Sequence, residues 1–93
     1  MGIFNNAPVS VTVRDSRVNG GSDTAIRSSS LNSFTVKITN SVLTGTTAAV
    51  QSDAGVTNLI SATQLSGIVS AAGTSKCVGA CDAKFTALGS ACN

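Results

Sequence analysis

An internal repeat with a period of about 25 residues constrains the fold of this chain more than any other feature. Val11–Gly20 (VTVRDSRVNG) aligns with Val36–Gly45 (VKITNSVLTG). Asn58–Gly67 (NLISATQLSG) is a weaker third copy, which follows the second at a slightly shorter offset. Repeats of this length are typical of supersecondary units that stack and share one continuous core. We therefore expect a fold built from stacked units.

Each copy begins with a segment in which apolar and polar residues alternate. The apolar set is Val9, Val11 and Val13, then Phe34, Val36 and Ile38, and the polar set is Ser10, Thr12 and Arg14, then Thr35, Lys37 and Thr39. Because successive side chains of a strand point to opposite faces, we expect strands with one buried and one solvated face. In the third copy Asn58 falls on an inward position and Leu59 on an outward one. A slip of one residue would reverse both.

A polar corner follows each strand. Asp15 and Asn40 occupy equivalent corner positions, and Ala62 stands at the third. We expect the first two to satisfy backbone groups at a bend rather than to act as catalytic or calcium-binding groups. The next positions carry hydroxyl groups, in Ser16, Ser41 and Thr63, which we expect to stack in the same turn.

Composition favours a single all-β domain over residues 1–93. Ser, Thr and Asn supply 32 of the 93 residues, whereas charged residues make up 11%, and the mean hydropathy is +0.30. Disordered chains combine low hydropathy with high net charge, and the net charge here is only +2. Helical bundles are richer in Glu, Lys, Leu and Ala than in Thr, Val, Ser and Gly.

Missing residue types exclude many kinds of active site. The chain has no His, Glu, Trp or Tyr, so a Ser-His-Asp triad, imidazole metal ligands and paired glutamates are absent. Asp15, Asp23 and Asp53 are not adjacent acids, and we expect turn and corner roles for them rather than a glycosidase pair. We therefore predict that the chain is not an enzyme, and that it needs no cofactor and no metal.

Charge patterning also argues against two classes of partner. The six cationic residues form no run and are not interleaved with aromatic residues in a pattern for base stacking, so we expect no nucleic-acid binding. The uncharged stretch 54–75 is long enough to cross a bilayer but contains Asn58, Gln64 and many hydroxyl groups. We therefore expect no membrane-spanning helix.

The order of strand, Asn-Ser or Asp-Ser corner, apolar-x-Gly and a Thr-Ala-Ile-like segment resembles the coils of right-handed parallel β-helices of the pectin-lyase-like family. The resemblance covers residues 9–73 and implies a short solenoid of about three coils, with residues 1–8 as an N-terminal segment and 74–93 as a C-terminal cap. A β-sandwich or partial barrel is the alternative. Within the cap we expect one or two helical turns from Asp82 to Leu88, with Asp82 as the N-cap.

All three cysteines, Cys77, Cys81 and Cys92, lie in the last seventeen residues. Their number predicts one disulfide and one free thiol, and a zinc site is the less favoured alternative because a fourth Cys or His ligand is lacking. The segment also resembles the cysteine-containing closing segment of some secreted bacterial β-helix proteins. That resemblance implies a bond between Cys77 and Cys92, with Cys81 as a buried free thiol. A disulfide favours a secreted or periplasmic location.

Two functions remain open at this point. The first is a non-catalytic module with a structural, self-associating or adhesive role, because a stub of three coils with Ile3 and Phe4 near one end should form a homo-oligomer. The alternative is binding, or remnant cleavage, of an acidic polysaccharide on an outward basic face formed by Arg14, Arg17 and Lys37. An ordinary solubilising surface is the other interpretation of these three residues.

Overall fold

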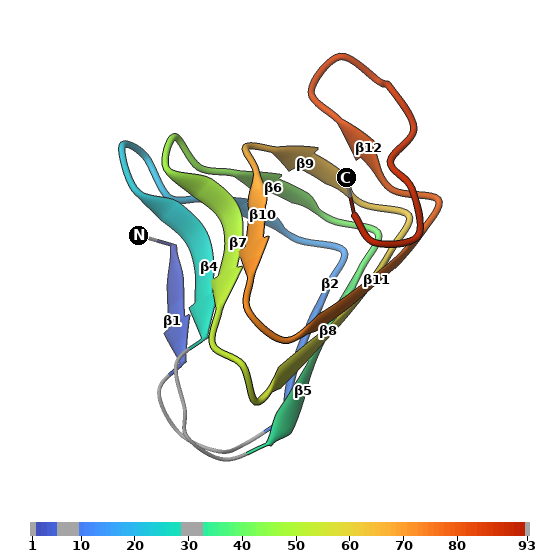
Figure 1. Cartoon of the computed structure of the whole chain (residues 1–93). Coiled ribbons are helices and arrows are strands. Elements are labelled where there is room, and N and C mark those ends of the chain that lie inside the picture. Colours follow the sequence, from blue (N-terminus) through green and yellow to red (C-terminus); the bar gives the residue numbers. More distant parts are fainter. Residues whose placement is uncertain (1, 6–9, 29–32, 93) are drawn as a thin grey trace.

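The computed structural model describes residues 2–5, 10–28 and 33–92, and every regular element in these ranges is a β-strand. Twelve strands form three four-stranded parallel sheets (Figure 1). Sheet 1 contains β1 (Ile3–Asn5), β4 (Thr24–Ser28), β7 (Ala48–Ser52) and β10 (Val69–Ala71). Sheet 2 contains β2 (Val11–Arg14), β5 (Phe34–Thr39), β8 (Val56–Ser61) and β11 (Thr74–Val78). Sheet 3 contains β3 (Arg17–Asn19), β6 (Val42–Thr44), β9 (Gln64–Ser66) and β12 (Cys81–Asp82).

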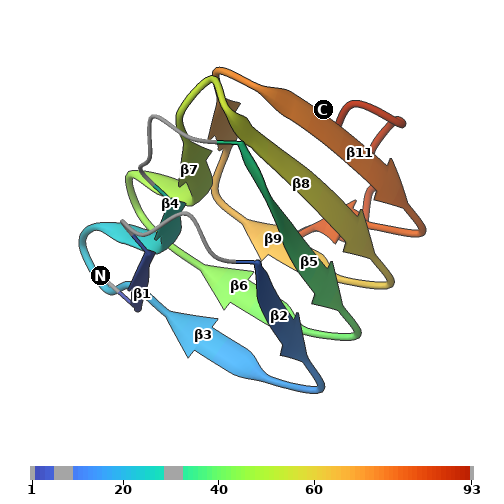
Figure 2. The ribbon, with the colours of Figure 1, turned by 90° about the horizontal axis from the view of Figure 1, so that it is seen from below.

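The chain visits the sheets in a fixed order, so that strands three apart in the sequence pair side by side (Figure 2). Val11 pairs with Val36, and Val36 pairs with Asn58. These are the residue matches on which the sequence alignment rests, and the prediction of an all-β chain is confirmed. A further copy follows, because Asn58 pairs with Ser75 at a separation of 17 residues. The segment 74–93 thus supplies β11 and β12 as well as the end of the chain.

One apolar core lies between the three sheets, and its residues come from inward columns that run across the strands. The columns are Val13, Ile38, Ile60 and Cys77 in sheet 2, Val18, Leu43 and Leu65 in sheet 3, and Ile26 and Val50 in sheet 1. Each fully buried Ile, Leu or Val side chain contributes about 1.5–3 kcal/mol of burial free energy. Asn58 is buried and Leu59 is half-buried on the opposite face, as the strand alternation predicts. The predicted positions of Val9 and of the Phe4 and Phe34 side chains lie outside the described part of the structure.

We call each passage of the chain through the three sheets a pass. The corner between sheets 2 and 3 has two residues between the flanking strands in every described pass. Its first residue adopts a left-handed conformation in Asp15, Asn40, Ala62 and Gly79, with φ values of 50°, 46°, 48° and 67°. Asp and Asn tolerate this conformation better than other non-glycine residues, and glycine adopts it without steric cost. The connection from sheet 3 to sheet 1 shortens at each repeat, and the connection from sheet 1 to sheet 2 keeps its length once and then shortens.

The predicted helical turns from Asp82 to Leu88 are wrong. Asp82 Oδ1 accepts hydrogen bonds from the amides of Lys84 (2.8 Å) and Thr86 (3.0 Å), and the bond from Lys84 is one that an N-cap residue makes. Phe85, however, has a φ of 59°, which takes the backbone out of a right-handed helix. The chain turns back instead, and Ala87 forms an antiparallel bridge with Cys81. No helix in the described ranges is long and apolar enough to cross a membrane.

Candidate functional site

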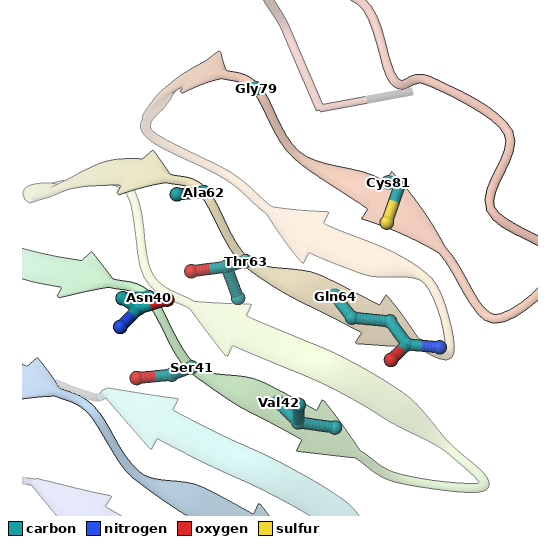
Figure 3. A pocket seen from close by; sticks show the side chains of 8 residues that line it. All are labelled: Asn40, Ser41, Val42, Ala62, Thr63, Gln64, Gly79 and Cys81. Carbon is teal, nitrogen blue, oxygen red and sulfur yellow. The ribbon is translucent and has the colours of Figure 1, made fainter.

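A shallow hollow of about 270 Å³ lies beside the corner between sheets 2 and 3 (Figure 3). It is lined by the two inner corners, Asn40–Val42 and Ala62–Gln64, and by Gly79 and Cys81 of the last one. Each corner residue lies next to its counterpart in the neighbouring pass, because the backbone amide of Asn40 donates to the carbonyl of Ser61 (3.1 Å) and that of Ala62 to the carbonyl of Val78 (3.0 Å).

Polar side chains of this corner form hydrogen bonds within the protein. Asn40 Nδ2 donates to Asp15 Oδ1 at 2.7 Å. The hydroxyls of Ser16, Ser41 and Thr63 each donate to the carbonyl two residues earlier, at 2.7–2.8 Å. The three residues occupy equivalent places in successive corners, as predicted, since the amides of Val42 and Gln64 donate to the carbonyls of Ser16 and Ser41. Hydroxyl groups held in this way by backbone carbonyls are structural elements of the turn and are not activated nucleophiles.

Cys77 and Cys92 form the disulfide that the resemblance implied, with a Cα–Cα distance of 5.2 Å. Cys77 continues the inward column of sheet 2 after Ile60, and both half-cystines are buried. The amide of Cys77 donates to the carbonyl of Ser90 at 2.8 Å. The bond therefore holds the end of the chain against the last strand of sheet 2.

Cys81 carries a free thiol, as predicted, but the side chain is half-buried rather than buried. The reason is its register, because Cys81 pairs with Gln64 on the outward side of sheet 3. Its sulfur lies at the rim of the corner hollow (Figure 3). Within the described part of the chain, no three Cys, His, Asp or Glu side chains gather as a metal site would need.

The structure distributes the three candidate glycan-binding residues over two faces. Arg14 and Lys37 are exposed on the outward side of sheet 2, on the neighbouring strands β2 and β5. Arg17 is also exposed but begins β3, on the far side of the corner at Asp15. The outward side of sheet 2 therefore holds only two of the three predicted residues.

A third cation on this face, Lys76, was not predicted from the sequence. Lys37 pairs with Leu59, and Leu59 pairs with Lys76, so the two lysines flank one leucine on adjacent strands. All three line a shallow hollow of about 230 Å³. The sequence contains a sign of this position, because Thr74–Gly79 (TSKCVG) repeats the pattern of Thr35–Asn40 (TVKITN). This fourth copy follows the third at a shorter offset than those between the earlier copies. We call Arg14, Lys37 and Lys76 together the basic face.

Hydroxyl groups surround the basic face, and acidic residues are absent from the strands that form it. Thr35, Thr57 and Thr74 lie in register across three strands, and β2, β5, β8 and β11 contain no Asp or Glu. The face is therefore positively charged over sheet 2 as a whole.

The carboxylates do not form a catalytic pair. Asp15 lies at the corner between sheets 2 and 3, Asp23 between sheets 3 and 1, and Asp53 between sheets 1 and 2. Asp23 Oδ1 accepts the amide of Thr24 at 2.8 Å, which is the expected role of an Asp in a turn. The three predicted turn and corner positions are confirmed, and each falls at a different corner.

The last pass ends in an asymmetric way. We call residues 83–92 the terminal segment. It contacts β11 through the backbone hydrogen bond from Cys77 to Ser90, and β12 through the bridge between Cys81 and Ala87. Among the described residues, no backbone hydrogen bond joins this segment to β10, the edge strand of sheet 1. An apolar hollow of about 360 Å³ adjoins β10 and is lined by Leu65, Ile68, Val69 and Leu88, among others. Ile68 is 65% exposed.

The chain was compared with known proteins at the level of family, sequence and fold. No protein-family model, no curated protein and no solved structure matches it.

Proposed function

We propose that this chain is a short right-handed parallel β-helix that acts without catalysis, as a structural module that pairs with a second copy of itself. The strand order supports the β-helix, since the chain passes through the same three sheets in the same order and pairs each strand with its predecessor. Crossovers between parallel strands of one sheet are right-handed in about 98% of cases. The disulfide between Cys77 and Cys92 supports a secreted or periplasmic location.

The open edge of β10 carries the proposal of self-association. The amide of Ala49 donates to the carbonyl of Ile68 (2.8 Å) and the amide of Ala72 donates to that of Ser52 (3.0 Å), so both groups face β7. Alternate residues of a strand direct their backbone groups to opposite edges. The backbone groups of Val69 and Ala71 therefore point away from β7, to the edge that the described residues leave open.

An unpaired strand edge beside exposed apolar surface is a template for another strand. A second copy fits this edge because it offers the same unpaired groups, and pairing of two β10 strands about a two-fold axis uses one surface on both copies. Such pairing also covers part of the apolar surface around Ile68. Each copy has one β10 edge, so pairing of β10 with β10 joins two copies.

Light scattering coupled to size exclusion tests this proposal. The wild-type chain should have twice its monomer mass of 9.2 kDa. Ala71→Pro removes an amide from the open edge and leaves the bonds to β7 in place, so it should give a monomer with an unchanged circular dichroism spectrum. Ile68→Lys should weaken the dimer in the same way, and Ser70→Ala is the matched control. A monomeric wild-type chain over a wide range of concentrations contradicts self-association.

A second candidate function is the binding of an acidic polysaccharide on the basic face. The register of Lys37, Leu59 and Lys76 favours it, because two ammonium groups flank an apolar residue on a sheet whose strands lack carboxylates. Binding of polygalacturonate should weaken with salt and should fall further in the double variant Lys37→Ala/Lys76→Ala. Lys84→Ala, in the terminal segment, is a control that removes one positive charge outside the basic face. Equal binding by the double variant and this control contradicts the candidate.

A further inference from the structure

The interior contains one side chain whose polarity the strand pattern does not explain. Asn58 lies in a second inward column of sheet 2, after Val11 and Val36 and before Ser75. Its exposed fraction is 0%. The amide group is therefore withdrawn from bulk water completely, and each of its polar atoms needs a partner inside the molecule.

Only one end of this amide is satisfied by the protein. Asn58 Nδ2 donates to the hydroxyl of Ser52 at 2.8 Å and lies 3.5 Å from the hydroxyl of Ser75. Asn58 Oδ1 is the one buried side-chain polar atom in the described residues that lacks a hydrogen-bond partner. An unmatched buried acceptor costs about 1–3 kcal/mol.

Turning the amide over does not remove the problem. The hydroxyls of Ser52 and Ser75 would then donate to the oxygen, and the NH₂ group would take the place without a partner. A water molecule can both donate and accept hydrogen bonds, so it satisfies the open atom in either orientation. One polar atom of the amide therefore needs a partner from outside the chain whichever way the side chain is turned.

The surroundings of Asn58 provide space and a second polar group. Ser75 occupies the level where the column has Val36 and Val11 on earlier strands, and a serine side chain is smaller than a valine. Ser75 also lines a hollow of about 300 Å³, together with Val69, Ala71, Gly73 and Ala91. The hollow therefore reaches Ser75, the residue that pairs with Asn58 on the neighbouring strand.

We propose that Asn58 and Ser75 bind one water molecule inside the protein, with the open atom of the Asn58 amide as its principal partner. Buried waters of this kind make about three hydrogen bonds to polar groups that otherwise lack partners. The water enters from the hollow at Ser75. The hollow is lined in part by Val69 and Ala71 of β10, so the site adjoins the open edge of β10, but it uses none of the backbone groups of that edge.

Water-to-protein nuclear Overhauser effects in the full chain test the site. In the wild type, the amide protons of β8 and β11 around Asn58 should show the sign that marks a water held longer than surface hydration. Asn58→Val restores the residue found at the preceding positions of the column, so it should fold and should lose these cross-peaks. Thr57→Val, at the neighbouring half-buried position on the outward side of β8, should keep them.

Two results would overturn the proposal. One is the absence of the cross-peaks in the wild type, and the other is their persistence in Asn58→Val. If Asn58→Val does not fold, Ser75→Ala replaces it, because removal of the second partner should shorten the residence time of the water and reduce the cross-peaks. Unchanged cross-peaks in Ser75→Ala then contradict the site as described.

Discussion

Asn40 donates a side-chain hydrogen bond of 2.7 Å to Asp15, a residue 25 positions earlier in the chain. The bond joins two left-handed corner residues of neighbouring passes and lies on the surface. It links β2 to β5 beyond the end of their backbone pairing.

Replacement of Asn40 by Ala should destabilise the protein by about 1–2 kcal/mol, because it removes this bond and places an alanine in a left-handed conformation. Urea unfolding followed by circular dichroism measures the change. Asn40→Gly separates the two effects, since glycine loses the bond but adopts the conformation without strain. Equal stability of Asn40→Ala and Asn40→Gly would contradict a conformational contribution.

Ala62 should be a favourable site for stabilisation. Its φ of 48° is costly for an alanine, and the position is equivalent to Asn40. Ala62→Asn should raise the free energy of unfolding by up to about 1 kcal/mol, because asparagine tolerates the left-handed region. Ala83→Asn, in an exposed turn, serves as the control in the same thermal melts. A lower melting temperature for Ala62→Asn than for the wild type would refute the expectation.

Inward residues of sheet 2 should contribute more to the free energy of unfolding than outward residues of the same sheet. Ile38 is completely buried, whereas Leu59 is half-buried on the outward side. Ile38→Ala should cost about 2–5 kcal/mol, through lost burial and the cavity that remains. Leu59→Ala should cost clearly less. Chemical denaturation of both variants checks the ranking, and a larger loss in Leu59→Ala would mean that the register of β8 is reversed.

The disulfide should stabilise the last pass. Cys77 and Cys92 are 15 residues apart, and closure of a loop of this length contributes about 3 kcal/mol in the chain-entropy description. The double variant Cys77→Ala/Cys92→Ala should lose stability of this order, whereas Cys81→Ser should change little. Denaturant midpoints measure both effects. A loss in Cys81→Ser as large as that in the double variant would point to a different pairing.

Thiol titration checks the cysteine assignment directly. The native protein should contain one reactive thiol, at Cys81, because this side chain is half-buried while the other two cysteines are bonded to each other. Cys81→Ser should contain none. Three thiols in the native wild type would contradict the disulfide.

The sequence predicts the strands and their register well where burial alternates residue by residue. Asn58 illustrates this, because its inward position follows from its alignment with Val36 although the residue itself is polar. Alternation carries no information on how many residues a connection needs, so the shorter offset that places Lys76 beside Leu59 was missed. The local signal of Asp82 as a helix cap was also insufficient, since the fold pairs Cys81 with Ala87 instead of continuing a helix.

The connection between sheets 2 and 3 has a constant length, so it fixes which residues of the following strand point inward. The other two connections lose residues along the chain, yet a left-handed residue stands at the same place before β3, β6, β9 and β12. Differences in the length of the other two connections therefore do not change the register of the strands that follow this corner. We therefore expect insertions between sheets 1 and 2 to be tolerated, whereas a single residue added after Asn40 would turn Leu43 of β6 toward solvent.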